Sequence, residues 1–340
     1  MTENSIKKEK KNFLEVKDLK KYFHLRGGII DTLLSREPEY VRAVDGVTFN
    51  IKEGEVFGLV GESGSGKTTI GRLVVGLEKP TEGTVIFDGI DLSSLSNEEM
   101  RKLRRRMQVM FQDPTASLNP RMTVGEAVSH PLQIHFPGKK ANHRKMMEEH
   151  LERVGLSPAS YFVNKYPHEI SGGQRQRVVI ARALITTPEL VLADEPIAMA
   201  DVSVRALLLD LMVRLKTELN LTYLFITHDL ATAKYICDRI GILYLGKMAE
   251  EGNLRDVYSK PLHPYTQALL AAVPIPDPHQ RRTEEMPEGE IPNPINPPSG
   301  CRFHPRCPIA EARCSEEEPF LRELLPGHKV ACHYAEQFLE

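Results

Sequence analysis

The feature that most constrains the fold is a glycine-rich segment that follows a short apolar run. The run VFGLV precedes GESGSGKTT, which matches the pattern G-x-x-x-x-G-K-[ST] from Gly61 to Thr68. Glycines at this spacing let the backbone turn tightly so that successive N–H groups point at phosphate oxygens. A helix that begins near Lys67 would present its positive N-terminal end to the same anions. The segment therefore predicts a strand, a phosphate-binding loop and a helix.

Within this loop we expect Lys67 to reach the β- and γ-phosphates of a nucleotide and the Thr68 hydroxyl to bind Mg²⁺. The whole loop is expected to contact the nucleotide: Gly61, Glu62, Ser63, Gly64, Ser65, Gly66, Lys67, Thr68 and Thr69.

Two adjacent carboxylates end a second apolar run, LVLADE. Asp194 is placed to hold the Mg²⁺ that bridges the phosphates, and Glu195 to orient or deprotonate the attacking water. Two carboxylates at a strand end could also form an ordinary polar turn. The phosphate-binding loop elsewhere in the chain favours the nucleotide interpretation.

The order of strand-like and helix-like segments indicates an α/β fold. The runs VFGLVG, LVLADE and YLFITH are short, apolar and rich in β-branched residues, which suits a parallel sheet buried on both faces. Between the second and third runs, VSVRALLLDLMVRLKTEL has the apolar periodicity of a crossover helix. From about residue 92 to 180, charged helical stretches interrupt this rhythm and predict a mostly helical insertion.

Changes in composition along the chain indicate the domain boundaries, and the net charge and apolar runs indicate which classes of partner to expect. We expect a flexible tail at 1–12, a nucleotide-binding domain at 13–255, and an extension at 256–340 with a proline-rich linker and a cysteine cluster. The formal net charge of -2 argues against a nucleic-acid partner. The N-terminal segment has no apolar run of a secretory signal, and no apolar stretch approaches the roughly 20 residues that span a bilayer. A cytoplasmic chain that meets the membrane through a partner is therefore expected.

Four further motifs accompany the loop and the carboxylates. They are VMFQDP with Gln112, ISGGQRQR at 170–177, ADVSV with Asp201 and FITHDL with His228. In this order and spacing the chain resembles an ATP-binding cassette (ABC) subunit of a membrane transporter. YVRAVDGVTFNIKEGE, HPYTQALL and the cysteine-rich tail resemble the ATPase subunits of oligopeptide and dipeptide importers. The resemblance implies a P-loop NTPase of ABC type, with a mixed sheet core and a helical subdomain at about 92–180, plus a small Cys-rich C-terminal extension.

The resemblance also implies roles for individual residues. Gln112 would couple the Mg²⁺ and the water to the transmembrane partner, and His228 would contact the γ-phosphate and the water. With Glu195 these are the expected catalytic residues, while Thr68, Gln112 and Asp194 are the expected Mg²⁺ ligands. An aromatic ring before the loop would stack on adenine, with Tyr40 as the candidate and Tyr22 as the alternative. Residues of the SGGQ segment and the following motif would complete the ATP site of a second subunit: Ser171, Gly172, Gly173, Gln174 and Asp201.

The segment after the carboxylates departs from the family pattern. In the family it resembles TSALD, whereas here Ile197 to Asp201 reads IAMAD, without the usual serine hydroxyl. Because this loop normally crosses to the partner's phosphate-binding loop, the change is compatible with a heterodimer of paralogous ATPase subunits, and a homodimer stays open. The resemblance further implies two transmembrane permease subunits, an extracellular solute-binding protein as an indirect partner, and a location at the cytoplasmic face of the cell membrane.

Four of the five cysteines lie near the C-terminus: Cys301, Cys307, Cys314 and Cys332. Disulfides are disfavoured in a reducing cytoplasm, and structural zinc normally uses close cysteine pairs, which are absent here. An iron-sulfur cluster takes four thiolates and tolerates wider loops, and similar tails in the importer family look cluster-binding. A [4Fe-4S] cluster is therefore expected, with Zn²⁺ or unligated thiols as alternatives and His304 or His333 able to replace one cysteine. Cys237 is expected to be a buried small hydrophobe.

The expected function is ATP hydrolysis that energises the import of oligopeptides or dipeptides. One alternative keeps the ATPase and changes the cargo to an oligosaccharide or another solute. An alternative of another class is a soluble ABC ATPase that acts on nucleic acid or ribosomes, which the charge and the lack of an aromatic-basic tract oppose. A cassette that binds ATP without hydrolysis is opposed by Glu195 and His228.

Overall fold

The computed structural model describes the chain except for residues 1–10, 26–38, 139, 274–289, 291 and 340. Its central feature is an eight-stranded sheet with strand order β11-β12-β10-β9-β3-β8-β7-β6. The strands β6, β7, β8, β3 and β9 pair in parallel, and β10, β12 and β11 continue the sheet in antiparallel pairing. This confirms the expected α/β fold with a mixed sheet. The bounds are β3 (Val56–Val60), β6 (Met107–Met110), β7 (Leu190–Asp194), β8 (Thr222–Thr227), β9 (Arg239–Tyr244), β10 (Lys247–Asn253), β11 (Arg322–Leu325) and β12 (His328–Val330).

The large sheet separates two apolar cores, as a strand with buried residues on both faces requires. Along β3, Val56 and Val60 face the core that also contains the helical region, while Phe57 and Leu59 face the core under the second sheet. Side chains alternate between the faces of a strand, so every residue of VFGLV is buried. Cys237 is 7% exposed within the first core, which confirms its expected role as a buried hydrophobe.

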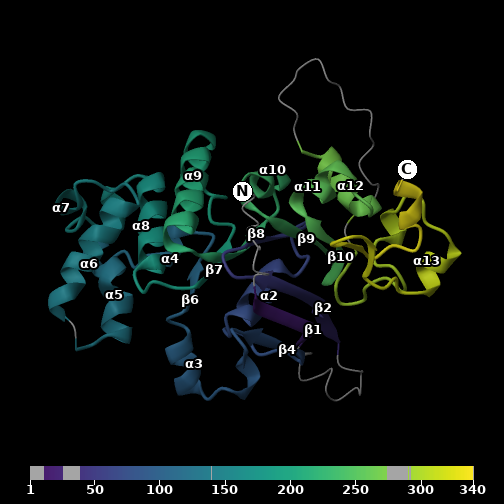
Figure 1. Ribbon diagram of the computed structural model, residues 1–340, viewed down its shortest axis with the longest axis horizontal. Helices are drawn as coiled ribbons and strands as arrows, with labels where there is room; N and C mark the ends of the chain where they lie inside the picture. Colours follow the sequence, from purple (N-terminus) through teal and green to yellow (C-terminus); the bar gives the residue numbers. More distant parts are fainter. Residues whose placement is uncertain (1–10, 26–38, 139, 274–289, 291, 340) are drawn as a thin grey trace, which may run out of the picture.

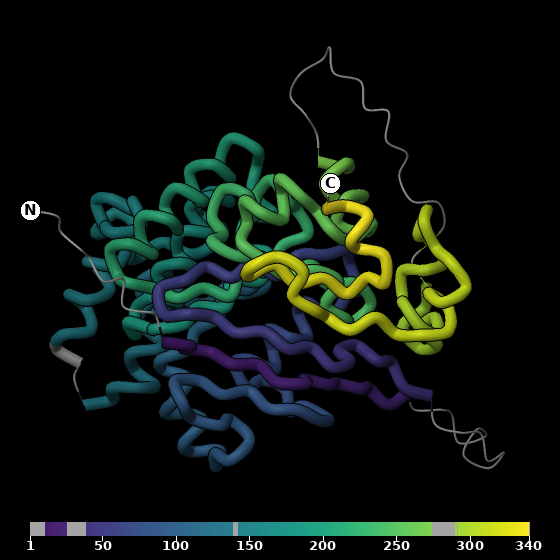
Figure 2. The backbone as a smooth tube through the Cα atoms, turned by 45° about the vertical axis from the view of Figure 1, so that its right-hand side comes forward, coloured from purple at the N-terminus to yellow at the C-terminus, as the bar shows by residue number. Residues whose placement is uncertain are grey.

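A second, antiparallel sheet covers the other core, with strand order β2-β1-β4-β5. Its strands are β1 (Asn12–His24), β2 (Tyr40–Lys52), β4 (Glu82–Phe87) and β5 (Ile90–Asp91). Figure 2 shows this sheet as purple and blue strands that run side by side. Helix α2 (Lys67–Val74) lies against it and buries Ile70, Leu73 and Val74 in the shared core.

Helices gather at one end of the molecule (Figure 1). They are α4 (Pro114–Ser117), α5 (Val124–His135), α6 (Lys140–Arg153), α7 (Ala159–Phe162) and α8 (Gly172–Leu184), of which α5, α6 and α8 pack on one another. Helix α3 (Asn97–Leu103) lies apart from this group, and its Leu103 is buried in the core under the second sheet. The region expected to be helical, about 92–180, also contains β6, which pairs with β7 in the main sheet. This strand is only four residues long and follows a charged helix, so its signal is weak in the sequence. In the residues that the structure describes, no helix is long and apolar enough to cross a bilayer.

The predicted crossover helix is α9 (Val202–Leu219), and α10 (Leu230–Ile236) follows β8. The C-terminal extension then contains α11 (Leu254–Ser259), α12 (Pro264–Ala271), a 3-10 turn at His304–Arg306, α13 (Ala312–Glu316), β11, β12 and a last turn at Ala335–Phe338. Because β12 pairs with β10, the extension continues the main sheet and does not form a separate layer. Most of the predicted linker and most of the N-terminal tail lie outside the described residues.

Candidate nucleotide site

The predicted phosphate-binding loop joins the end of β3 to the start of α2, as the sequence pattern indicates. Gly64 and Gly66 have φ angles of 79° and 105°, in the left-handed region that favours glycine. A Cβ atom on Gly66 would also lie 2.2 Å from the backbone oxygen of Ala43. The loop conformation therefore needs glycine at this position.

Lys67 lies inside the loop, and its side chain is held by the loop backbone. Its Nζ donates to the carbonyl oxygens of Gly61 at 2.7 Å and Glu62 at 2.8 Å, and it is 6% exposed. Burial lowers the pKa of Lys67, while nearby carboxylates, Glu195 first among them, oppose the shift. The ammonium group is thus positioned where phosphate oxygens would enter the loop.

Thr68 and Asp194 come together from α2 and the end of β7. The Thr68 hydroxyl donates to Asp194 Oδ1 at 3.2 Å. Burial raises the pKa of Asp194, although the hydrogen bond from Thr68 opposes the shift. A hydroxyl and a carboxylate are the hard oxygen ligands that Mg²⁺ prefers, so this pair fits a magnesium ion.

Glu195 joins the other two predicted catalytic side chains. Gln112 Nε2 donates to Glu195 Oε2 at 2.8 Å, and His228 Nδ1 lies 2.9 Å from Glu195 Oε1. The three residues follow β6, β7 and β8, which are adjacent parallel strands whose carboxyl ends meet at one edge of the sheet. Ligand sites in open α/β sheets lie at this edge. The sequence motifs are therefore brought together where the fold expects a site.

The backbone at Glu195 is in an unusual conformation for a residue with a side chain. Its φ angle is 47°, and its N–H donates to the carbonyl oxygen of Ile226 on β8 at 2.9 Å. Such conformations persist only where surrounding contacts fix them, and they cluster at functional sites. Here the neighbouring strand fixes the direction in which the carboxylate points.

The SGGQ segment lies elsewhere, at the start of α8 in the helical region. Ser171 Oγ accepts from the Gln174 N–H at 3.3 Å, and Gln174 Oε1 accepts from the Ser171 N–H at 2.9 Å. This capping box starts the helix. Figure 1 places α8 with α5 and α6, apart from α2, so the chain does not bring this segment to its own phosphate-binding loop. Gly172 and Gly173 form the first turn of α8, and Asp201 precedes α9.

The two adenine-stacking candidates differ in their surroundings. Tyr40 starts β2, is 39% exposed, and has its ring centroid 4.4 Å from that of His24. The Tyr22 hydroxyl donates to Asp45, and burial together with this bond raises the pKa of Tyr22 to about 12. Tyr40 therefore offers an exposed ring, whereas the hydroxyl of Tyr22 is engaged in the protein.

Sequence reasoning missed one group of contacts at the loop. The Glu62 carboxylate, which we expected to lie in the nucleotide site, accepts from the guanidinium of Arg306 in the C-terminal extension at 3.0 and 3.3 Å. The Glu62 N–H donates to the hydroxyl of Tyr265 on α12 at 3.0 Å. Arg306 lies directly before Cys307, in a segment for which the sequence predicted only a metal site.

The four C-terminal cysteines converge on one small cavity. Burial raises the pKa of Cys301 to about 12 and that of Cys332 to about 11. His304 and His333 also line the cavity, but each has a ring nitrogen within hydrogen-bond distance of a backbone carbonyl. Across the part of the chain that the structure describes, no group of three or more His, Cys, Asp or Glu side chains is arranged to hold a metal ion. The expected iron-sulfur or zinc ligand set is therefore not confirmed.

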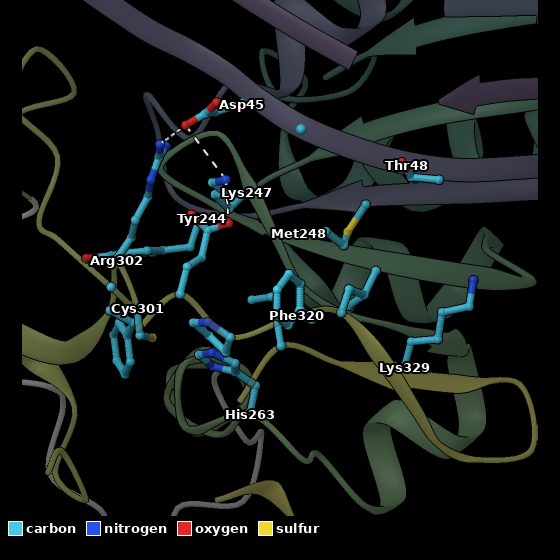
Figure 3. Close-up of a pocket in the computed structure, with 18 of the residues that line it drawn as sticks. Asp45, Thr48, Tyr244, Lys247, Met248, His263, Cys301, Arg302, Phe320 and Lys329 are labelled. Carbon is cyan, nitrogen blue, oxygen red and sulfur yellow. Dashed lines mark hydrogen bonds and ion pairs between the residues drawn. The ribbon is translucent and has the colours of Figure 1, made fainter. Parts of the chain in front are cut away.

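A larger cavity of about 600 Å³ lies between the N-terminal strands and the extension. Figure 3 shows Arg302 and Lys247 directed at Asp45, and both form ion pairs with it. Burial raises the pKa of Asp45, but the hydrogen bond from Tyr22 and these cations outweigh burial and leave the pKa lowered. The ion pair between Arg302 and Asp45 therefore connects the C-terminal extension to β2.

A phosphate-binding loop, a hydroxyl and a carboxylate for Mg²⁺, and a glutamate at the adjoining strand end define a P-loop ATPase. The ABC transporter family model matches residues 44–198, and the oligopeptide/dipeptide transporter C-terminal region matches residues 249–314. The chain belongs to the ABC transporter family, among its oligopeptide/dipeptide transport ATP-binding proteins.

Individual relatives agree with this membership. The oligopeptide transport ATP-binding protein AppF of Bacillus subtilis is 50% identical over 94% of this chain and 96% of its own length. OppF of Salmonella typhimurium, which carries the same description, is 46% identical over 97% of this chain and 98% of its own length. Among solved structures, the dimeric cassette MJ0796 bound to ADP and Pi has a TM-score of 0.61 and 35% identity, and covers 71% of this chain and 99% of its own. The ABC-type architecture expected from the sequence is thus confirmed.

Proposed function

We propose that this chain is the ATP-hydrolysing subunit of an ABC importer of oligopeptides or dipeptides. The observation that carries the proposal is the contact of Gln112 and His228 with the two oxygens of Glu195 at the carboxyl end of the sheet. Lys67 and the pair of Thr68 and Asp194 lie at the same edge. The cargo class follows from the printed names of relatives that match nearly the whole chain. An oligosaccharide or another solute is the alternative cargo.

Each side chain then has a task in hydrolysis. Lys67 and the loop N–H groups would hold the phosphates, and Thr68, Asp194 and Gln112 would hold Mg²⁺, which when bound would neutralise charge on the phosphates. Glu195 orients the attacking water or takes its proton. The imidazole of His228 orients one carboxylate oxygen of Glu195, and Gln112 binds the other oxygen.

A second ATPase subunit completes the site. We assign Ser171, Gly172, Gly173, Gln174 and Asp201 to the partner's nucleotide, because the helix that the SGGQ segment starts, α8, lies apart from α2 of its own chain. The solved relative described as dimeric with ADP and Pi supports a two-subunit arrangement. In the departing loop, Ile197 is 6% exposed and Met199 is 66% exposed, so the methionine is available to a partner. We propose a paralogous ATPase as that partner.

The remaining partners follow from membership in the importer family. Two permease subunits would bind the ATPase pair at the cytoplasmic face of the cell membrane, and an extracellular solute-binding protein would deliver the cargo. A [4Fe-4S] cluster, with Zn²⁺ as the alternative, stays a prediction for the four cysteines. Their convergence on one cavity supports it, and iron and zinc analysis of the protein purified without oxygen tests it.

The ATPase assignment is tested by Glu195→Gln. This change keeps the size of the side chain and a hydrogen-bonding oxygen but removes the base, so we expect turnover to fall at least a hundredfold while ATP binding persists. Glu218→Gln is a matched control, because Glu218 is an exposed residue on α9 paired with Arg214. Turnover of the Glu195 variant at the parent rate would refute the assignment.

A further inference from the structure

The second residue of the phosphate-binding loop, Glu62, is held by the C-terminal extension at its N–H and at its carboxylate. The Glu62 N–H donates to Tyr265 Oη at 3.0 Å, and its carbonyl oxygen accepts from Lys67 Nζ at 2.8 Å. Its carboxylate accepts from Arg306 Nη1 at 3.0 Å and Nη2 at 3.3 Å. A two-bond contact between a guanidinium and a carboxylate fixes both distance and orientation.

The arginine in this contact is itself rigidly placed. Its side chain is 7% exposed, and that of Glu62 is 24% exposed, so solvent screens the pair less than a surface ion pair. The guanidinium lies 5.9 Å from the ring centroids of Tyr244 and Phe303 and donates to the Tyr244 hydroxyl at 3.4 Å. Phe303 is 1% exposed and packs edge to face on Tyr244 at 5.3 Å. Rotation of Arg306 away from the loop would therefore disrupt a packed core.

The contact has an electrostatic consequence for the nucleotide. Glu62 is an acidic residue in a loop that must bind phosphates. Its negative charge attracts the ammonium group of Lys67 and so opposes the lowering of the Lys67 pKa by burial. Without Arg306, a negative charge beside the loop would be uncompensated and would repel a polyanion. The Glu62 carbonyl accepts from Lys67 Nζ, so a loop that has lost the Arg306 contact would also hold Lys67 less firmly.

We propose that Arg306 is a positioning residue for ATP binding, which holds the phosphate-binding loop through Glu62 and neutralises its charge. The C-terminal extension thus forms part of the nucleotide site of its own chain, through a residue adjacent to the thiol-lined cavity. This inference rests on the ATPase function proposed above.

The test is a double-mutant cycle on the full chain, read as the Kd of a fluorescent ATP analogue with Mg²⁺. Arg306→Gln is expected to weaken binding about tenfold or more. In the Glu62→Gln background the same change should have less than about a threefold effect, because the charge to be neutralised is gone. Arg313→Gln is the control, since Arg313 is an exposed arginine of the extension paired only locally with Glu317.

A conservative variant separates the charge of Arg306 from its geometry. Arg306→Lys keeps the charge but loses the two-bond geometry, so an intermediate Kd is expected, and it serves as the informative variant if Arg306→Gln does not fold. Equal weakening by Arg306→Gln in both backgrounds would overturn the proposal, as would an unchanged Kd in either Arg306 variant with the fold intact. If the parent chain itself does not bind the analogue, the ATPase function fails, and that result is distinct from a failure of the Arg306 contact.

Discussion

Glu250 on β10 offers a strong test of how the extension is attached to the core. The residue is 0% exposed, and its carboxyl oxygens accept from the N–H groups of Leu262 at 2.8 Å and His263 at 2.9 Å. His328 Nε2 on β12 lies 2.7 Å from the same group. One side chain thus joins β10 to the start of α12 and to the neighbouring strand β12.

The magnitude of the loss follows from the partners that Glu250→Ala leaves without an acceptor. Each buried donor that loses its partner costs about 1–3 kcal/mol, so two N–H groups and one imidazole suggest roughly 3–9 kcal/mol. Glu250→Gln keeps one accepting oxygen and should lose about half as much. Loss on this scale is a large part of the stability of an ordinary domain.

Urea unfolding followed by circular dichroism, together with limited proteolysis of the extension, measures the effect. Glu318→Ala is the control, because Glu318 is 57% exposed and pairs with Lys247, an arrangement worth less than about 1 kcal/mol. If Glu250→Ala unfolds at the parent midpoint and its extension is cut no faster, the attachment does not depend on this buried carboxyl group.

Two other predictions concern the loop and the helical region. Gly66→Ala would place a methyl group 2.2 Å from the Ala43 oxygen at a φ of 105°, so we expect at least a tenfold weaker Kd for ATP, whereas Gly138→Ala meets nothing within 4 Å and should bind normally; equal affinities would refute the steric argument. Burial lowers the pKa of His150 below 6.5, so the unfolded chain binds its proton more readily. The free energy of unfolding is therefore not reduced by His150 above about pH 6.5. Below that pH it decreases as the pH falls, by up to about 1.4 kcal/mol per pH unit, because the unfolded chain takes up the proton first. His150→Leu should therefore flatten the fall in urea midpoint between pH 7 and 5.5, and parallel pH profiles would contradict this.

The candidate site residues that the sequence could place are those whose position depends on local spacing or on a strand end. The loop around Lys67 needs only a strand, a tight turn and a helix, all of which are encoded in one short run. Glu195, Gln112 and His228 each follow an apolar strand, and parallel pairing of those strands brings their side chains together. Each motif thus specifies its own residue locally, and the parallel pairing of the strands joins the three residues into one site.

The features that the sequence did not predict depend on contacts between distant segments. Arg306 and Glu62 are 244 residues apart, and nothing local to either residue indicates the other. Strand β6 is short and becomes recognisable only through its pairing with β7. The cysteine spacing predicted a metal site. In the structure the same segment also places Phe303 in the main core and Arg306 against the phosphate-binding loop.

The pairing of β12 with β10 also affects how the chain is made. Strand β10 ends at Asn253 and β12 begins at His328, so synthesis must continue for tens of residues before the edge of the core sheet is covered. At about 5–20 residues per second this interval lasts on the order of 4 to 15 s. Meanwhile the outer edge of β10 exposes unpaired backbone groups to neighbouring nascent chains. Strand β12, which is translated long after β10, therefore protects the cassette from edge-to-edge aggregation.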